Sequence, residues 1–383
     1  MPKEVTRHIS REIERELWAR AAGRCEFAGC NRLLYVSPVT QERVNTAEKA
    51  HIYSFSKDGP RGWGLLNGDS ALNSLSNLML VCHDCHRTID DDKDGSRYSV
   101  ELLVEWKRQH EERVCIVTGI SPDKKSHVVL YGANIGEERS PLQYVSAVEA
   151  MFPAWYPAEE KPVVLSMSCE HEDTTPEYWS TEERNLKAAF DRHIAPRIRE
   201  EKCSHFSVFA LAPQPLLTLL GSLFTDKIEA EVYQLHREPR TWRWQSHPEG
   251  FAFTVNRPLN YDYPPALIMS LSDRVAPERI TSVLGDNVSI WEVTVNECHN
   301  DFMRSPAQLS TFRDVMRYLM VSIKEQHGQS TPLNVFPAMP VSCAVELGRI
   351  RTPKADMPWT IFDQNNKAGA FIRTITIPGG NNG

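Results

Sequence analysis

The chain has 383 residues, more than a single hydrophobic core usually organises, so its length predicts at least two domains. Hydrophobic residues make up 41% and charged residues 24%, which is typical of globular proteins and argues against a disordered or membrane-embedded chain. The net charge of −7 argues against a protein that holds nucleic acid permanently through phosphate contacts.

The first residues are charged throughout and lack the apolar stretch of a signal peptide. No apolar run approaches the roughly 20 residues that a membrane-spanning helix needs. We therefore expect a cytoplasmic protein with no membrane association.

Two helices are expected in the N-terminal part. Residues 8–22 carry apolar side chains at helical spacing, with Ser10 as a suitable N-cap. A second helix is expected to follow Ser99 and to end near Arg113. The polar, proline-containing segment 121–126 is typical of a linker. The predicted organisation is a first domain, a linker and a second domain at residues 1–120, 121–126 and 127–383.

Beyond the linker, short runs of β-branched residues alternate with helical patterns. The expected strands are HVVLYGANIG, VVLSMSCEHE, HFSVFALAPQP, EAEVYQLHREP, ALIMSLS and VSIWEVTVNE. Buried strands with helices between them indicate an α/β fold with a largely parallel sheet. Two such sets fit, at residues 127–255 and 256–383. Ligands of such folds bind at the carboxyl ends of the strands.

Four of the nine cysteines form two close pairs. Cys25 and Cys30 have CX4C spacing, and Cys82 and Cys85 have CXXC spacing. In a reducing compartment such pairs favour metal ligation over disulfides. Four thiolates from two tight turns suit tetrahedral zinc, so we expect a structural Zn²⁺ site. The alternative is four reduced, buried cysteines.

Three further features accompany these cysteines. His51 stands in the tripeptide AHI, Asn77 in LSNLML, and His86 directly follows Cys85. The order AHI, SNL and CXXCH resembles the HNH family of nucleases, whose α+β fold, called ββα-metal, joins two strands and a helix around a catalytic divalent cation. The resemblance implies that His51 is the general base and that His86 is a cation ligand. It also implies that Asn77 holds the hairpin loop and so orients His51.

The residue types suit this chemistry. Histidine has an unperturbed pKa close to neutral and can deprotonate the attacking water. A divalent cation stabilises charge on the leaving oxygen. Asp90 lies four residues after His86, so on a helix both side chains share one face and could chelate the cation together. The alternative is that Asp90 belongs to a solvated acidic run.

The sequence does not determine which divalent cation binds. Ala50 precedes His51 where one common pattern of the family has Asp or His, so the other ligands would come from Asp90, Asn77, water and DNA phosphate. Magnesium, manganese and nickel all suit such a nitrogen and oxygen site, with Mg²⁺ favoured by its availability.

The second region resembles the SAVED domain in FALAPQPLLTLLGSLFTDK, YQLHREPRTWRW and ECHNDFMRSPAQLSTFRDVMR. That domain consists of two fused, Rossmann-like units related to the CARF fold, which agrees with the two α/β sets. An HNH nuclease followed by a SAVED domain resembles the effector nucleases of CBASS, a bacterial anti-phage defence. The resemblance implies that a cyclic dinucleotide or trinucleotide binds the SAVED domain. It further implies that binding drives assembly into a homo-oligomer, a dimer or tetramer, which cuts double-stranded DNA.

Candidate ligand contacts follow from residue type, because bases stack on aromatic rings and phosphates bind cations or backbone amides. On a strand, TWRW would place the indoles of Trp242 and Trp244 on one face, directed to the ligand or to the core. The other candidates lie at expected strand or helix ends: Arg237, Gln214, Pro213, Ser270, Ser272, Ser166, Met167, Lys227 and Asn300.

Two other functions fit parts of the sequence. One is a zinc-knuckle DNA-binding regulator without nuclease activity, which has no chemical need for His51, Asn77 and His86 together. The other is an unregulated restriction-type HNH nuclease, which would cut DNA without any small molecule.

Overall fold

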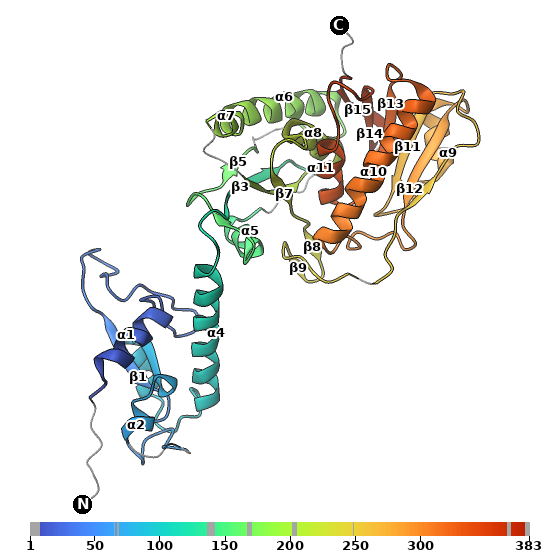
Figure 1. Ribbon diagram of the computed structural model, residues 1–383. Coiled ribbons are helices and arrows are strands. Elements are labelled where there is room, and N and C mark those ends of the chain that lie inside the picture. Colours follow the sequence, from blue (N-terminus) through green and yellow to red (C-terminus); the bar gives the residue numbers. More distant parts are fainter. Residues whose placement is uncertain are drawn as a thin grey trace, which may run out of the picture. The chain divides into compact units, whose positions relative to one another are not determined.

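The computed structural model describes residues 8–64, 66, 69–135, 142–166, 171–200, 205–247, 249–365 and 369–379 (Figure 1). The chain divides into two compact units, Met1–Ser121 and Pro122–Gly383. None of the helices in the described residues is both long enough and apolar enough to cross a bilayer.

The first unit contains a two-stranded antiparallel sheet that runs directly into a helix. Strand β1 pairs with β2 so that Ala47 lies opposite Cys82 and His51 opposite Leu78. Helix α3 starts at the next residue, His83, and packs on both strands. The elements of this unit are α1 (Arg11–Arg20), β1 (Ala47–His51), α2 (Asp69–Leu72), the 3-10 turn η1 (Leu75–Asn77), β2 (Leu78–Cys82), α3 (His83–Asp90) and α4 (Val100–Thr118).

Capping residues set the starts of the two outer helices. The Ser10 hydroxyl accepts a hydrogen bond from the Ile13 amide, and the Ser99 hydroxyl accepts one from the Leu102 amide. Both caps were predicted. Helix α4 continues past the predicted end near Arg113, because no glycine or proline interrupts it before Gly119.

The second unit holds two largely parallel sheets, as expected for two fused α/β sets. The first has the strand order β4-β3-β6-β7, with β5 also paired to β3, and all its pairs are parallel. Its elements are β3 (Lys125–Gly132), α5 (Tyr144–Met151), β4 (Tyr156–Pro157), β5 (Val163–Val164), α6 (Pro176–His193), α7 (Ala195–Arg199), β6 (Phe206–Leu211), α8 (Gln214–Phe224) and β7 (Ala230–Val232). Lys125 and Ser126, predicted to lie in the linker, are the first residues of β3, because they pair with β4.

The second sheet has the order β10-β12-β11-β13-β14-β15, in which β10 and β15 are antiparallel edge strands. A small hairpin, β8 (His236–Arg237) and β9 (Arg240–Thr241), precedes it. Its elements are β10 (Thr254–Asn256), β11 (Pro265–Ser270), α9 (Pro277–Leu284), β12 (Ser289–Thr294), α10 (Pro306–His327), β13 (Leu333–Ala338), α11 (Val341–Arg349), β14 (Trp359–Asn365) and β15 (Ala370–Ile377).

Helices α8 and α11 join the two halves. Each follows a strand in an equivalent way: β6 leads to Pro213 and α8, and β13 leads to Pro340 and α11. Pro340 follows Pro213 at the same distance in the sequence as Gly348 follows Gly221. Helix α8 also contacts β13 to β15, whereas α11 contacts β6 and β7, so each helix packs on the other half's sheet. This internal repeat was not identified from the sequence, although it is visible there.

The two glycines allow these helices to touch backbone to backbone. A Cβ added at Gly221 would overlap with the carbonyl oxygen of Val345, and one added at Gly348 would overlap with the carbonyl oxygen of Thr218. Because backbone atoms cannot move aside as a flexible side chain can, neither position accepts a side chain without separating the helices.

We expect Gly221→Ala to destabilise the second unit by about 1–3 kcal/mol or more, the usual cost of overpacking a core. Chemical denaturation of the full chain, followed by tryptophan fluorescence, measures this loss. Ser222→Ala in the same helix is the matched control and should change stability far less. Equal stability of Gly221→Ala and the control would contradict the close contact between α8 and α11.

Candidate metal centres and ligand cavity

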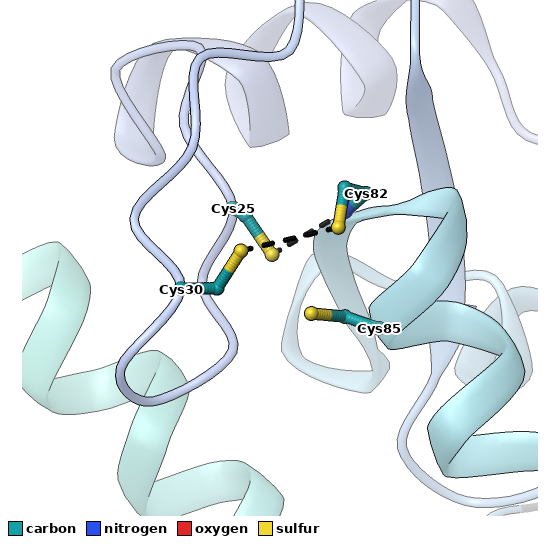
Figure 2. Close-up of side chains that lie close together, drawn as sticks. All are labelled: Cys25, Cys30, Cys82 and Cys85. Carbon is teal, nitrogen blue, oxygen red and sulfur yellow. Dashed lines mark hydrogen bonds between the residues drawn. The ribbon is translucent and has the colours of Figure 1, made fainter. Parts of the chain in front are cut away.

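The four paired cysteines meet in one cluster. The sulfurs of Cys25, Cys30, Cys82 and Cys85 all lie within 4.8 Å of one another and point toward a common centre (Figure 2). The Cys30 and Cys82 sulfurs are 3.9 Å apart, close to the separation of about 3.8 Å that a tetrahedron with Zn–S bonds of about 2.3 Å requires. Burial raises the pKa values of Cys25 and Cys85, so these thiols keep their protons unless a metal displaces them. The donor set therefore suits zinc.

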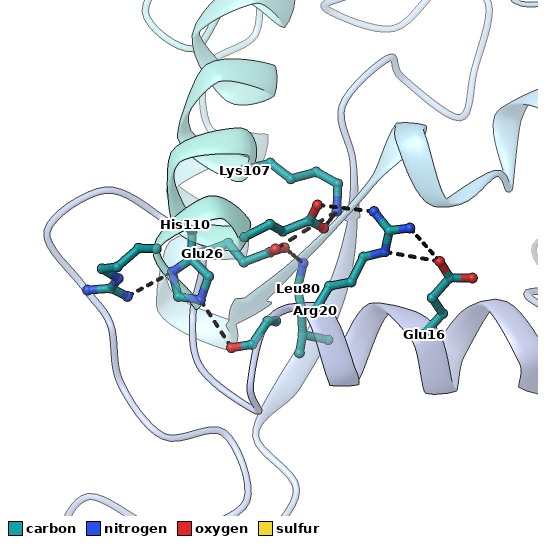
Figure 3. Close-up of polar contacts among 9 residues, drawn as sticks. Glu16, Arg20, Glu26, Leu80, Lys107 and His110 are labelled. Carbon is teal, nitrogen blue, oxygen red and sulfur yellow. Dashed lines mark hydrogen bonds and ion pairs between the residues drawn. The ribbon is translucent and has the colours of Figure 1, made fainter. Parts of the chain in front are cut away.

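The turn between Cys25 and Cys30, called the first knuckle below, is held to the rest of the unit by a buried charge network (Figure 3). Glu26, next to Cys25, is 1% exposed, and its carboxylate accepts a 2.5 Å hydrogen bond from the Leu80 amide of β2. The ammonium group of Lys107, on α4, lies 3.9 Å from the same carboxylate. Burial raises the pKa of Glu26 to about 7, and Lys107 opposes this shift. The network thus ties the knuckle to both β2 and α4.

Asn77 fastens the loop that follows β1. Its side chain is 2% exposed, and its oxygen accepts a 2.7 Å hydrogen bond from the Tyr53 amide. Its nitrogen donates to the Leu72 carbonyl at 2.8 Å and to the Tyr53 carbonyl at 3.3 Å. A residue with these bonds holds the backbone just after His51 and so influences its orientation indirectly.

His51 is the last residue of β1, and its ring contacts the Phe55 ring, with centroids 5.5 Å apart, and a different asparagine. Its Nε2 lies 3.1 Å from Oδ1 of Asn73, which is 7% exposed. Asn73 was not singled out from the sequence, since nothing in ALNSLSN distinguishes it from an ordinary turn residue.

His86 and Asp90 lie side by side on α3. His86 Nδ1 is 3.4 Å from Asp90 Oδ2, as expected for positions i and i+4 of a helix. The neighbouring Asp92 is only 5% exposed, and its carboxylate accepts hydrogen bonds from the Arg97 and Tyr98 amides. The acidic run therefore divides: Asp92 holds a turn, whereas Asp90 faces His86 and is available to chelate a cation with it.

Arg61 connects the His51 region to this acidic segment. Its guanidinium group donates to the carbonyl oxygens of Ile52 at 2.6 Å and of His51 at 3.4 Å. Burial lowers the pKa of Arg61, and the negative charges of Asp90 and Asp92 oppose that shift. The histidine, the guanidinium group and the acidic residues thus belong to one polar region. Arg61 was also missed from the sequence, because its loop matches no pattern.

The second unit contains a cavity of about 720 Å³ at the carboxyl ends of its strands, where ligands were expected. The segments after β6 and β13 border it, as do the starts of α8 and α11 and the end of β14. Three predicted ligand residues line it: Gln214, Arg237 and Asn300. The other polar residues in its lining are Asp173, Thr174, Gln234, His236, Arg240, Asp301, Asp363, Gln364 and Asn365.

Cationic groups in the cavity are exposed, whereas much of its polar wall is already bonded. The carboxylate of Asp301 accepts from the backbone amides of Arg237 and Glu238, which holds the β8–β9 turn. The guanidinium groups of Arg237 and Arg240 form no ion pair with another described residue. The Gln234 side chain accepts from the amide and hydroxyl of Ser342 and thereby ties the β7–β8 connection to α11.

The two tryptophans of TWRW lie outside the described cavity lining. Trp242 is 4% exposed and packs edge-on against Phe209 with ring centroids 5.3 Å apart. The Trp244 indole donates a 3.2 Å hydrogen bond to Glu231. The expected strand alternation is wrong here, because β9 ends at Thr241 and the chain then bends. Core packing, the alternative for both rings, is what the structure shows.

The remaining predicted ligand residues have local structural contacts and are likewise absent from the described lining. The buried Ser270 hydroxyl accepts from the Val275 amide, and the Ser166 hydroxyl accepts from the Gly132 amide. Pro213 is the N-cap of α8. Ser272 follows β11, where its amide donates to the Ala338 carbonyl; Lys227 is exposed in the turn after α8; and Met167 lies outside the described residues.

Fold and sites together define a two-part protein, in which a ββα unit with a four-cysteine cluster is joined to an α/β unit with a polar cavity. Family models match both parts: an HNH endonuclease model at residues 25–93, and the SMODS-associated and fused to various effectors sensor domain, SAVED, at residues 186–377. The second match covers half of the sequence, so the chain belongs to the SAVED family. The predicted combination of an HNH endonuclease domain and a SAVED domain is confirmed.

Solved structures to which the chain is similar include a Cap4 SAVED/CARF-domain containing receptor from Acinetobacter baumannii with the cyclic trinucleotide 2′3′3′-cAAA. It is 11% identical, with a TM-score of 0.43, over 77% of this chain and 60% of that one. A Cap4 SAVED/CARF-domain containing receptor from Moraxella osloensis is 11% identical, with a TM-score of 0.40, over 76% and 64% of the two chains. The matched part is thus less than two thirds of each receptor. No curated protein matches the chain.

Proposed function

We propose that this protein is a cytoplasmic effector nuclease of a CBASS anti-phage system. In this proposal, a cyclic dinucleotide or trinucleotide binds the cavity of the SAVED domain and activates the HNH domain, which then hydrolyses double-stranded DNA. The observation that carries the proposal is one chain in which an HNH domain with His51, His86 and Asp90 is joined to a sensor domain with a polar cavity.

The residues of the first unit suit phosphodiester hydrolysis. His51 would accept the proton of the attacking water. A divalent cation bound by His86 and Asp90, with Mg²⁺ as the first choice, would stabilise the charge on the leaving oxygen. Arg61, which donates to the His51 carbonyl, and Asn73, which contacts the His51 ring, would hold His51 in position. Zn²⁺ bound by the four cysteines would hold the turn with Cys25 and Cys30 against the junction of β2 and α3.

The cavity suits a nucleotide of several units. Its volume of about 720 Å³ falls in the upper part of the range of about 300–1,000 Å³ that is usual for ligand sites. The exposed guanidinium groups of Arg237 and Arg240 can pair with phosphates, and the side chains of Gln214, Asn300 and Gln364 can hydrogen-bond base edges.

Assembly would explain how a chain with a net charge of −7 comes to act on DNA. Several HNH units in one assembly would bind the same DNA molecule together, and so more tightly than a single unit binds it. The activator can drive this step only if it binds the assembled state more tightly than the free one. Light scattering with and without activator tests it: we expect a dimer or tetramer, and an unchanged mass would refute activation by assembly.

The direct test is cleavage of plasmid DNA by the purified full chain with MgCl₂, with and without a panel of cyclic dinucleotides and trinucleotides. We expect cleavage only with a member of the panel. Cleavage of equal rate without any nucleotide would favour an unregulated nuclease. DNA binding without cleavage under every condition, including MnCl₂ and NiCl₂, would favour a DNA-binding regulator.

Binding of an anionic activator should weaken as the pH rises through about 7. Burial, together with the negative charge of Asp173, raises the pKa of Asp363 in the cavity wall to about 7. Below that pH the Asp363 carboxyl is neutral, and above it the new charge repels phosphates. We expect the affinity to fall by up to about tenfold per pH unit above 7.

Isothermal titration calorimetry across this pH range measures the effect. Asp363→Asn should bind with little pH dependence, whereas Asp273→Asn, at an exposed position outside the described lining, should behave as the unchanged protein does. An equal pH dependence in all three proteins would show that Asp363 does not titrate beside the ligand.

A further inference from the structure

His236 combines deep burial with unsatisfied hydrogen-bonding groups. It is the first residue of β8, it lines the cavity, and only 1% of it is exposed. Neither Nδ1 nor Nε2 has a hydrogen-bond partner among the described residues. Buried polar atoms are nearly always paired in native proteins, so such a residue in a cavity wall points to a partner that arrives with a ligand.

The fold holds His236 firmly in this position. Its backbone pairs with Thr241 in the β8–β9 hairpin, and Asp301 fastens the next turn through two backbone amides. The rings of His236 and Trp244 lie nearly perpendicular to each other, with centroids 6.3 Å apart. The backbone therefore holds His236 in place, and the N–H of the neighbouring Trp244 indole already donates to Glu231.

The protonation state defines what His236 can bind. Burial lowers its pKa from the ordinary value; Asp301 opposes the shift and Arg304 adds to it. Near neutral pH the imidazole is uncharged, so one ring nitrogen is a donor and the other an acceptor. A phosphodiester has only acceptor atoms, so it could pair with the donor nitrogen of the ring but not with the acceptor nitrogen.

We propose that His236 is a specificity residue whose acceptor nitrogen takes a hydrogen bond from an exocyclic amino group of a nucleobase, while its N–H donates to another acceptor of the activator. This inference rests on the proposed function. Burial distinguishes the residues that would bind phosphate from the one that would bind a base. Arg237 and Arg240 are exposed and suit phosphates, whereas His236 is buried in the cavity wall and suits a base.

Removing the imidazole should change binding and stability in opposite directions. His236→Phe keeps an aromatic ring of similar shape but removes both unsatisfied nitrogens. We expect its affinity for the activator to fall at least tenfold, because two hydrogen bonds are lost. We expect the Tm of the ligand-free protein to rise by about 2–4 °C, because two buried polar atoms without partners disappear.

His327→Phe is the matched control. Its ring nitrogen accepts a 3.1 Å hydrogen bond from the Trp291 indole, and it is absent from the described cavity lining. This control should lower the Tm and leave binding unchanged. If His236→Phe fails to fold, His236→Asn, which keeps one donor and one acceptor group, supplies the binding measurement and should retain more affinity than His236→Ala.

The probes are 3′3′-cyclic di-AMP, 3′3′-cyclic di-GMP, 2′3′3′-cAAA and 3′3′3′-cAAA, measured by calorimetry on the full chain. The one that binds tightest is compared with its analogue lacking the exocyclic amino groups. The analogue should bind the unchanged protein more weakly, but should bind His236→Phe about as well as the parent probe does.

The failures can be told apart. If none of the four probes binds the unchanged protein and no member of the wider panel activates DNA cleavage, the proposed function falls and this inference with it. If a probe binds equally well to the unchanged protein and to His236→Phe, the inference is overturned and the proposed function stands. An analogue penalty of the same size in both proteins likewise overturns the assignment of His236 to the base.

Discussion

His51→Ala should reduce activator-dependent DNA cleavage by about 100-fold to 10,000-fold, the usual contribution of a general base. The variant should still fold, because His51 ends β1 at a partly exposed position. Its loss removes the hydrogen bond of the ring to Asn73 and its edge contact with Phe55, each worth about 1 kcal/mol. Initial rates of plasmid nicking at saturating activator and MgCl₂ measure the effect. Added imidazole should restore part of the rate if the missing group is a base.

His83→Ala is the matched control for this experiment. His83 starts α3, its side chain is 64% exposed, and its ring lies 3.5 Å from the carboxylate of Glu48 on the surface. We expect this variant to cut DNA at nearly the unchanged rate. A His51→Ala protein that is folded and as active as the control would remove His51 from the reaction.

Cys82→Ser should unfold the HNH unit and abolish the zinc binding that we propose for the four cysteines. Structural zinc in small domains contributes about 10–16 kcal/mol of binding free energy, which is as large as the whole stability of a typical domain. Cys82 is also 1% exposed, so the substitution leaves a hydroxyl group in a buried sulfur cluster. Zinc content by mass spectrometry and protection of residues 8–118 from hydrogen exchange measure the two losses in the full chain.

Two comparisons define what Cys82→Ser shows. Cys115→Ser, at an exposed position on α4, should keep both zinc and fold. His86→Ala should also keep them but lose cleavage, since we assign His86 to the catalytic cation and not to zinc. Loss of zinc in His86→Ala would show that the ligands are divided wrongly between the two metals.

Local patterns predicted the HNH unit in detail, because its key residues are close in sequence or lie in a recognisable order. Ser10 and Ser99 cap their helices as expected, and the CX4C and CXXC pairs bring four sulfurs together. Helical periodicity placed Asp90 beside His86. It could not show that Asp92 turns inward to bind the Arg97 and Tyr98 amides, which depends on the turn after α3.

The cavity was predicted less well, because its walls come from segments far apart in the chain. Gln214, Arg237 and Asn300 were found by their places at strand or helix ends. Trp242 and Trp244 were not distinguished from core residues, since an indole packs as readily against Phe209 as against a base.

The sequence by itself determined the division into two units, the α/β class of the second unit, the four-cysteine cluster and the HNH motif, because each depends on periodicity or on short spacing. Only the tertiary structure decided that Asn73 and Arg61 contact His51, that Gly221 and Gly348 let two helices touch, and that His236 lies unsatisfied in a cavity wall. The reason is physical: burial and hydrogen-bond partners depend on packing between segments distant in the chain, and local residue preferences do not encode that packing.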